Sequence, residues 1–577
     1  MAMFNRPALP RRRFGLADLA VAVFVFGLLY AFIRLGSGMV VPFSEQKQIS
    51  INLSPIFLPY YAGRSLLRMF IAFAASLLFT FIYGYAAAKS RTAEKVLVPL
   101  LDILQSVPVL GFLSATVTAF MGLFPGRMTG VELASIFAIF TGQAWNMTFS
   151  FYHSLITVPE DLKEAARIYR LNWWQKFVRL EVPYSMMGLV WNAMMSFGGG
   201  WFFLAASEAI TVLNKDVRLP GIGTYLAVSL EQRNLHAVFW AIGTMVLIII
   251  LVDQLFWRPI VAWAQRFKVE LSASTDEPTS AVLTLLRRSP LADWIGEHIF
   301  TPPLLGFDRM MSRFATASAA FSNRTGGART MSVAQWLIAV ALGFVSLRYA
   351  WLGIHAVAQL PGGDLLGVLW YGVLTMLRVV VAIGLGAAWT IPVGVAIGLN
   401  PRLSRIAQPL VQIAASFPAN MLFPFITVLY LKLHVNFELG AIPLMMLGTQ
   451  WYILFNVIAG AMAIPSDLRE AAAVFKLRGA QRWKHLIGPG IFPFLVTGCV
   501  TAAGGAWNAS IVSETVSWGH QTLAATGLGR FISDATAVGN WPGIIWGITL
   551  MAVFVVGLNR LLWRRLYRLA ETRYRIG

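Results

Sequence analysis

Charged residues are scarce in this sequence, making up only 12% of its 577 positions. Apolar residues make up 57%, and the mean hydropathy is +0.66, far outside the usual range of a soluble domain. This composition excludes a soluble fold and predicts a polytopic membrane protein.

Cysteine is almost absent. Cys499 is the only one, so the chain can form neither an intrachain disulfide nor a cysteine metal cluster. The seven histidines are scattered without a metal-ligand spacing. The sequence also has no Gly-x-x-x-x-Gly-Lys-Ser/Thr phosphate-binding loop, nucleophile elbow or His-Glu-x-x-His pattern. We therefore expect no metal, no cofactor and no enzymatic activity, and any ATP must be used by a partner.

Long apolar runs recur along the whole chain. Each is long enough to cross about 30 Å of hydrocarbon as a helix. The runs are continuous rather than alternating, which excludes barrel strands. We expect an all-α protein of about twelve transmembrane helices, the first of them retained because no clear cleavage site follows it. The clearest runs are residues 16–35, 66–88, 131–158, 238–257, 333–351 and 544–563.

The net charge of +20 comes from basic residues beside the apolar runs. This placement indicates membrane topology rather than binding to nucleic acid. If six helices alternate in direction, the basic groups at 11–13, 89–95, 163–179 and 258–268 all fall on one side. The same holds for the second half of the chain. We assign these segments and both termini to the cytoplasmic side of a cell (inner) membrane, so the expected contacts include lipid and no nucleic acid.

The second half of the chain repeats the first at a nearly constant offset. The offset is 310 early in each half and 306 from Gly142 onward, so the first half carries four extra residues near 122–130. A constant register across unlike residue types indicates a duplication. Examples are Arg68 and Arg378, Ser106 and Ser416, Trp145 and Trp451, Trp201 and Trp507, and Glu208 and Glu514.

Each half contains an even number of expected spans, so both enter the membrane in the same orientation. This arrangement predicts parallel repeats related by an axis along the membrane normal. Ion-coupled carriers of the inverted-repeat kind instead use an odd number of spans in each half.

Two polar segments, 159–183 and 465–489, occupy matching positions in the two halves. A proline and then acidic residues open each segment, which suits the first turn of a helix. Such a helix is too polar to span the membrane and lies on the basic side. We interpret it as a docking element for a protein partner, with a helix lying on lipid as the alternative. Residues sharing one face are Leu162, Ala165, Ala166 and Tyr169, and then Leu468, Ala471, Ala472 and Phe475.

Both segments resemble the EAA loop of type I ABC importer permeases, whose form is Glu-Ala-Ala-x-x-x-Gly followed by an aromatic residue and a proline. In that family the loop is a coupling helix held in a groove of the ATPase subunit. The family's glycine is replaced by Arg170 and Lys476. Its loss predicts a more continuous helix or a partner with a matching acidic groove, and Gly479 would supply a turn in the second copy only. The resemblance implies docking of two ATPase copies through Glu164, Ala165, Ala166, Glu470, Ala471 and Ala472.

Further residues resemble permeases for nitrate, sulfonate, taurine or bicarbonate, especially their duplicated forms. A glutamate stands between a Trp-led apolar run and Gly-x-Gly in both halves, at Glu208 and Glu514. The resemblance implies an anion or small organic acid as substrate. The expected periplasmic loops, of which 36–63 is the longest, are too short for a receptor domain, which favours a separate periplasmic substrate-binding protein.

We expect the chain to divide into two type I permease domains with flanking segments. Residues 1–63 form a tail, the first span and a periplasmic loop, and 64–258 the first permease domain. Residues 259–330 form a cytoplasmic linker with an amphipathic helix around 291–314. Residues 331–365 form the seventh span and a loop, 366–565 the second permease domain and 566–577 a cytoplasmic tail.

Charges within spans need partners. We predict ion pairs from Arg68 to Glu208 and from Arg378 to Glu514 that brace an outer gate, with direct anion contact by the arginines as the alternative. Candidates for lining the path are chosen because polar and amphipathic groups in spans face protein or water, and core packing is the alternative for each. They are Ser106, Trp145, Trp201, Ser416, Trp451 and Trp507.

The predicted function is the transmembrane subunit of an ABC importer. Two rivals stay open at this point: an ion-coupled secondary transporter, and a membrane-embedded enzyme or assembly scaffold. Neither rival expects paired EAA loops.

Overall fold

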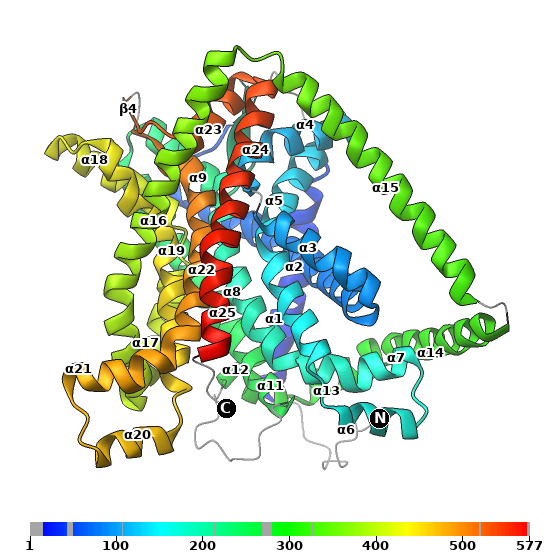
Figure 1. The fold of residues 1–577 in the computed structure, drawn as a ribbon. Helices are drawn as coiled ribbons and strands as arrows, with labels where there is room; N and C mark the ends of the chain where they lie inside the picture. The colour runs from blue at the N-terminus through cyan, green and yellow to red at the C-terminus, as the bar shows by residue number, and fades with distance from the viewer. Residues whose placement is uncertain are drawn as a thin grey trace.

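The computed structural model describes residues 15–42, 50–106, 108–212, 215–267, 280–324, 327–518 and 521–573. Within them, two successive sets of helices follow the same order (Figure 1). The first set is α1 (Leu16–Ser37), α2 (Leu58–Lys89), α3 (Arg91–Ser106), α4 (Leu113–Leu123), α5 (Met128–Ile156), α8 (Val182–Glu208) and α10 (Leu235–Val252). The second set is α15 (Gly327–Val357), α16 (Gly362–Leu399), α17 (Pro401–Ser416), α18 (Phe423–Leu433), α19 (Phe437–Met462), α22 (Gly488–Ser513) and α24 (Trp541–Leu558).

Shorter elements repeat in the same register. Helices α6 (Glu160–Ile168), α7 (Trp173–Lys176) and α9 (Ile222–Glu231) correspond to α20 (Ser466–Val474), α21 (Gly479–Arg482) and α23 (Leu528–Val538). The π-helical turns η3 (Phe177–Glu181) and η4 (Asp253–Trp257) recur as η8 (Trp483–Ile487) and η9 (Asn559–Trp563), again 306 positions later. Because π-helical turns are rare, their recurrence at one offset supports the duplication independently of sequence similarity.

Each half also contains one antiparallel hairpin, which the sequence reasoning missed. Strands β1 (Ala209–Val212) and β2 (Lys215–Arg218) follow α8, and β3 (Thr515–Trp518) and β4 (Gln521–Ala524) follow α22. Apart from an isolated bridge between Pro42 and Arg127, the remaining regular structure of the described residues is helical. The prediction of an all-α polytopic membrane protein is confirmed.

Eight described helices are long and apolar enough to cross a membrane, or nine if α17 and α18 form one span. These two helices meet at an angle of 78°. The break falls at Pro418, since a proline disfavours helical conformation in the residue before it. The count of twelve spans stays a prediction.

The turns that follow α3 and α17 exchange sides between the halves. The 3₁₀ turn η2 (Val109–Phe112) and α4 join a hydrophobic core built mainly by α16, α19, α22 and α24. Reciprocally, Met421 in the turn η7 (Ala419–Leu422) joins the core of α2, α5, α8 and α10. The breaks therefore lie where the two halves meet.

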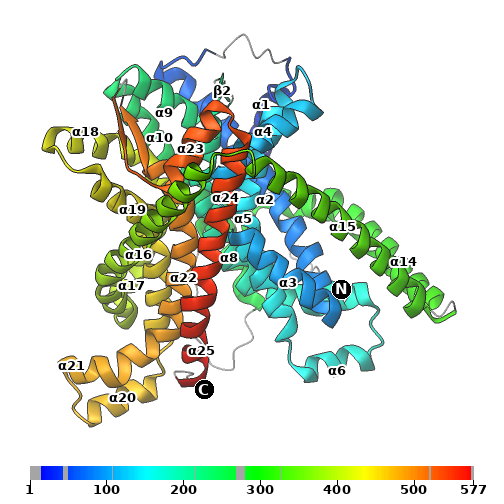
Figure 2. The same cartoon turned by 45° about the horizontal axis from the view of Figure 1, so that its top comes forward.

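Helices α6 and α20 lie at one end of the bundle, and α9 and α23 lie at the other (Figure 2). Helix α25 (Arg564–Arg573) lies toward the end that holds α6 and α20. The start of α1 reaches the linker helix α13 (Pro290–Ile295), where the Asp18 carboxylate accepts hydrogen bonds from the Ser289 hydroxyl and the Leu291 amide. From there α14 (Thr301–Arg324) runs outward beside α7, and α15 returns along the periphery (Figure 1).

Candidate functional site

The predicted docking segments form short helices that stop at the same place. Helix α6 follows Pro159 and α20 follows Pro465, and acidic residues stand in the first turn of each, where the helix dipole favours them. At the α6 start, Lys163 donates a 2.8 Å hydrogen bond to Glu160 and holds the pKa of that carboxyl below its usual range.

The expectation of a more continuous helix at Arg170 and Lys476 is wrong. Both residues adopt left-handed backbone conformation, with φ of 48° and 53°, and each docking helix ends there. The amide of Leu171 donates to Ala166 O and that of Arg170 to Arg167 O, the two hydrogen bonds of a Schellman motif. Leu477 and Lys476 repeat them onto Ala472 and Ala473. The turn needs no glycine because these bonds hold a basic residue in the conformation that glycine would adopt more easily.

The docking helices present acidic and apolar side chains to solvent. Glu164 and Glu470 are exposed, and neither forms an ion pair within the part of the chain that the structure describes. Ala166 and Ala472 are buried, whereas Ala165 is half-buried and Ala471 exposed. Each helix ends with a pair of exposed apolar residues, and the sequence reasoning missed one residue of each pair, Ile168 and Val474. These pairs are Ile168 and Tyr169, and Val474 and Phe475, all 77–79% exposed.

The first docking segment is tied to the linker. Trp174 Nε1 donates a 2.8 Å hydrogen bond to Asp308 of α14, and its ring contacts Phe307 edge-on. Asn172 Nδ2 donates to Ser312 O at 3.2 Å. The second segment has Ala480 where the first has Trp174, so this hydrogen bond has no counterpart. The linker thus supports one docking segment and makes the pair unequal.

A second difference lies where each docking segment joins its membrane helix. In the first half, Lys89 at the end of α2 forms a 2.7 Å ion pair with the buried Glu181 of η3. The offsets place Leu399 and Ile487 at these positions in the second half, where both belong to its apolar cluster. The same joint is therefore ionic in one half and hydrophobic in the other.

The predicted charged pairs lie at the opposite end of the bundle. Arg68 Nη1 is 2.6 Å from Glu208 Oε1, and Arg378 Nη1 is 2.9 Å from Glu514 Oε1. Helix α8 has 27 residues, so Glu208 lies about 40 Å along it from the docking segment. Each arginine also donates to a backbone carbonyl beside the Gly-x-Gly turn, at Pro220 or Thr526. Each pair therefore joins three segments of its half; its action as an outer gate stays a prediction.

Each cluster contains a further carboxylate that the sequence reasoning missed. Arg68 Nε is 2.5 Å from Glu132, and Arg378 pairs with Glu438. Adding 306 to 132 gives 438, so the repeat offset alone could have identified these two glutamates as an equivalent pair. Arg64 also pairs with Glu132, and position 374 in the second half is a leucine. The first cluster thus holds two arginines and two glutamates, all buried, whereas the second holds one arginine and two glutamates.

The Gly-x-Gly turns allow these clusters to close. A Cβ on Gly221 would collide with the Glu208 carboxylate, and one on Gly527 would collide with the Glu514 carboxylate. The Gly223 amide donates to Glu208 at 2.7 Å, and the Arg530 amide donates to Glu514 at 3.1 Å. The first glycine of each Gly-x-Gly turn thus leaves space for the buried carboxylate.

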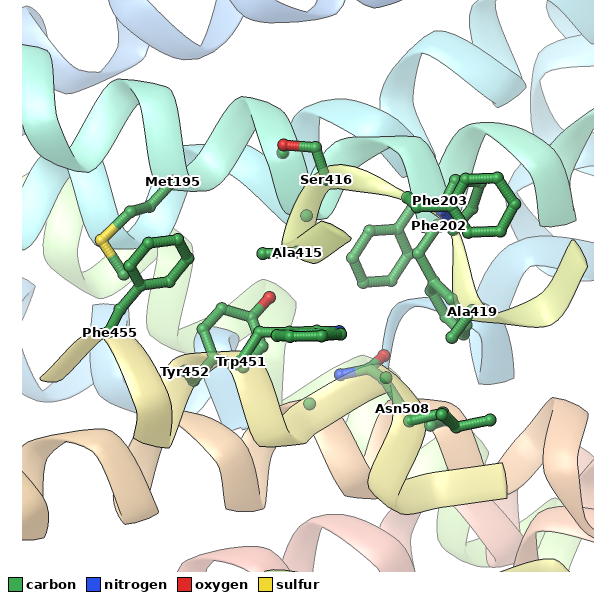
Figure 3. A pocket seen from close by; sticks show the side chains of 18 of the residues that line it. Met195, Phe202, Phe203, Ala415, Ser416, Ala419, Trp451, Tyr452, Phe455 and Asn508 are labelled. Atoms are coloured by element: carbon green, nitrogen blue, oxygen red, sulfur yellow. The ribbon is translucent and has the colours of Figure 1, made fainter. Parts of the chain in front are cut away.

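A cavity of about 70 Å³ lies where the halves meet, between α8 on one side and α17, α19 and α22 on the other (Figure 3). Two predicted path residues, Ser416 and Trp451, line it. Trp201 and Trp507 are 1% exposed and belong to the cores of their halves, which is the packing alternative. Trp145 is not among the described lining residues and contacts Phe79 edge-on. The side chain of Ser106 lies outside the described residues.

A family model described as "Binding-protein-dependent transport system inner membrane component" matches the chain twice, at residues 80–256 and 381–576. Together these ranges cover more than half of the chain. Each contains one docking helix and the two membrane helices that follow it.

Individual relatives are similar to about a third of the chain. A bicarbonate transport system permease protein of Synechococcus elongatus is 29% identical over 30% of this chain and 59% of its own length. A nitrate import permease protein of Leptolyngbya laminosa is 26% identical over 34% and 65%. A taurine transport system permease protein of Escherichia coli is 26% identical over 36% and 73%. The chain thus matches less than two thirds of the length of the first two relatives.

Proposed function

Because the chain belongs to the family of binding-protein-dependent transport system inner membrane components, we propose that it is the permease of an ATP-driven importer for a small anion. One chain supplies both halves of the membrane path. Separate ATPase subunits, one on each docking helix, supply the energy, and a separate binding protein delivers the substrate from the periplasmic side. The docking helices and both termini lie in the cytoplasm.

The observation that carries the proposal is the pair of docking helices at one end of the bundle. Each leaves a glutamate and two large apolar side chains in solvent, although exposed apolar groups of this size favour contact with a partner. Both helices lead through a π-helical turn into a membrane helix, α8 or α22. A displacement of the docking helix would therefore reach the contact between the halves through one continuous segment.

The names of the relatives support an anionic substrate. They are permeases for bicarbonate, nitrate and taurine, each of which carries an anionic group. A secondary transporter is the alternative function, and it would move substrate without an ATPase.

Co-purification of an ATPase with the full chain tests the proposal. We expect the double variant Glu164→Lys and Glu470→Lys to lose the ATPase, because it reverses the charge of both docking helices. Glu297→Lys, an exposed charge reversal in the linker, is the control and should keep it. Normal association and uptake by the double variant would overturn the docking role. Uptake that persists after ATP depletion would favour the secondary transporter.

A further inference from the structure

The cavity between the halves is polar but uncharged. Its described lining contains the hydroxyls of Ser416 and Tyr452, the amides of Gln412 and Asn508 and the indole of Trp451, and none of the lining residues carries a formal charge. Ser416 is 7% exposed, and within the described chain neither hydroxyl has a hydrogen-bond partner. These hydroxyls are therefore available to a ligand.

Both hydroxyls lie against one pair of glycines on α8. A Cβ on Gly198 would lie 3.0 Å from Ser416 Oγ, and a Cβ on Gly199 would lie 2.9 Å from the Tyr452 hydroxyl oxygen. Because Gly198 and Gly199 are adjacent, the two hydroxyls approach neighbouring points of the same backbone from different helices. Figure 3 shows Ser416 and Tyr452 on different sides of the space.

Asn508 makes the cavity asymmetric. Its Oδ1 accepts a 2.8 Å hydrogen bond from the Val109 amide, at the break between α3 and α4. The offsets relate Val109 to Ala419 and Asn508 to Phe202. Phenylalanine cannot accept a hydrogen bond, so Phe202 leaves the second break without the acceptor that closes the first. One of the two related breaks therefore has a side-chain acceptor for its backbone amide, and Phe202 supplies none at the other.

The remaining N–H of Asn508 adds a third donor. Its Nδ2 donates to Gly504 O at 3.2 Å, and a side-chain amide carries two protons. Apolar groups lie at the two ends of the space, with Met195 and Phe455 at one end and Phe202 and Phe203 at the other (Figure 3). At about 10–15 Å³ for each water molecule on this measure, the volume admits a group of only a few heavy atoms.

We propose that this cavity is a transient binding site for one small oxyanion, held by the neutral donors of Ser416, Tyr452 and Asn508. The inference rests on the proposed function and deepens it. Neutral donors stabilise negative charge in a low-dielectric site, and with no cation on the lining the anion can leave again, as a transport path requires. The absence of a carboxylate from the described lining removes the repulsion that would exclude an anion.

The site is tested by anion binding to the purified full chain in lipid nanodiscs, without ATPase. The probes are ¹⁵N-nitrate, ¹³C-bicarbonate and ¹³C-taurine, measured by saturable NMR line broadening. We expect at least one probe to bind, and Ser416→Ala and Tyr452→Phe each to weaken its affinity about tenfold, as for a lost hydrogen bond to a charged group. Phe202→Asn should also weaken binding, because the new amide would accept a hydrogen bond at the second break, as Asn508 does at the first.

Matched controls remove hydroxyls elsewhere in the same half. Ser510 donates to Trp507 O within α22 and Tyr430 lies on α18, and neither is a described lining residue. Ser510→Ala and Tyr430→Phe should bind as the parent chain does. The inference is overturned if none of the three probes binds saturably, or if the cavity variants and the controls bind equally.

ATPase co-purification on the same preparations separates the two proposals. Loss of anion binding in the cavity variants with the ATPase retained supports the site. Saturable anion binding to a chain that never retains an ATPase would overturn the proposed function and leave the site standing.

Discussion

Arg170 and Lys476 occupy equivalent positions in the two halves and share one backbone conformation, with φ of 48° and 53°. Left-handed conformation costs about 1–2 kcal/mol for a residue other than glycine. Both halves nevertheless keep a basic side chain at the turn that ends the docking helix. Both basic side chains are exposed at the end of their helix.

Replacing both residues by glycine should stabilise the chain, by about 1 kcal/mol at each site, because glycine adopts this conformation without steric conflict. The thermal unfolding midpoint of the detergent-purified chain measures the effect. Arg167→Gly is the control within α6 and should destabilise the helix by up to about 1 kcal/mol. A lower midpoint for the double glycine variant would show that the side chains make stabilising contacts.

Removing Arg68 should destabilise the chain by about 3–5 kcal/mol, because Arg68→Ala leaves two buried carboxylates with Arg64 as their one arginine and Glu208 without an ion pair. Glu132 and Glu208 are 2% and 0% exposed. Arg378→Ala also leaves a buried carboxylate, Glu514, without its arginine, but it should cost less because the other carboxylate, Glu438, is 43% exposed and can remain hydrated. Thermal unfolding of the two variants compares them directly, and equal losses would contradict this account.

Neutralising one carboxylate in each cluster should destabilise the first cluster more than the second. Glu132→Gln leaves Arg64 and Arg68 facing Glu208 alone, an excess positive charge in a buried site, and should cost about 3 kcal/mol or more. Glu438→Gln leaves one arginine opposite one glutamate and should cost less than about 1 kcal/mol. The amount of monodisperse protein on size-exclusion chromatography and the unfolding midpoint report both. A Glu438→Gln variant as unstable as Glu132→Gln would refute the charge-balance argument.

Gly221→Ala should be among the most damaging single methyl additions in the chain. The new Cβ would overlap the Glu208 carboxylate, which is buried and held by hydrogen bonds from Ser65, Arg68 and the Gly223 amide. We expect a loss of about 3 kcal/mol or more. Gly243→Ala, on α10 with nothing within 4 Å of its added Cβ, is the matched control and should be neutral or stabilising. Similar midpoints for the two variants would mean that the turn is not tightly packed.

Trp174→Phe should loosen the linker from the first docking segment. It keeps the aromatic contact with Phe307 and removes the hydrogen bond to Asp308, which is worth about 1 kcal/mol. Hydrogen exchange of residues 301–318 should therefore speed up by roughly fivefold where exchange reports local opening. Trp294→Phe, which stacks on His298 within the linker, should leave that exchange unchanged.

Local patterns were sufficient to predict the repeats, the docking helices and the two main ion pairs. Each depends on residues whose meaning is clear within a short window: prolines followed by acids, or a charge inside an apolar run. The prediction of a more continuous helix failed at Arg170, because two backbone hydrogen bonds hold this residue in the turn for which a glycine was expected. The sequence reasoning also missed Glu132, although the repeat offset relates it to Glu438; its contact with Arg68 appears only in the structure.

The sequence by itself determined that this chain is a duplicated membrane protein with a short polar helix at matching positions of its two halves, because hydropathy, charge placement and a fixed repeat offset act along the chain. Only the tertiary structure decided what the two halves do differently. Asn508 closes one broken span and Phe202 leaves the other open, and this difference appears only when segments about 400 positions apart are in contact. A repeat offset can relate equivalent positions, but it does not show which residue of the opposite half each one meets.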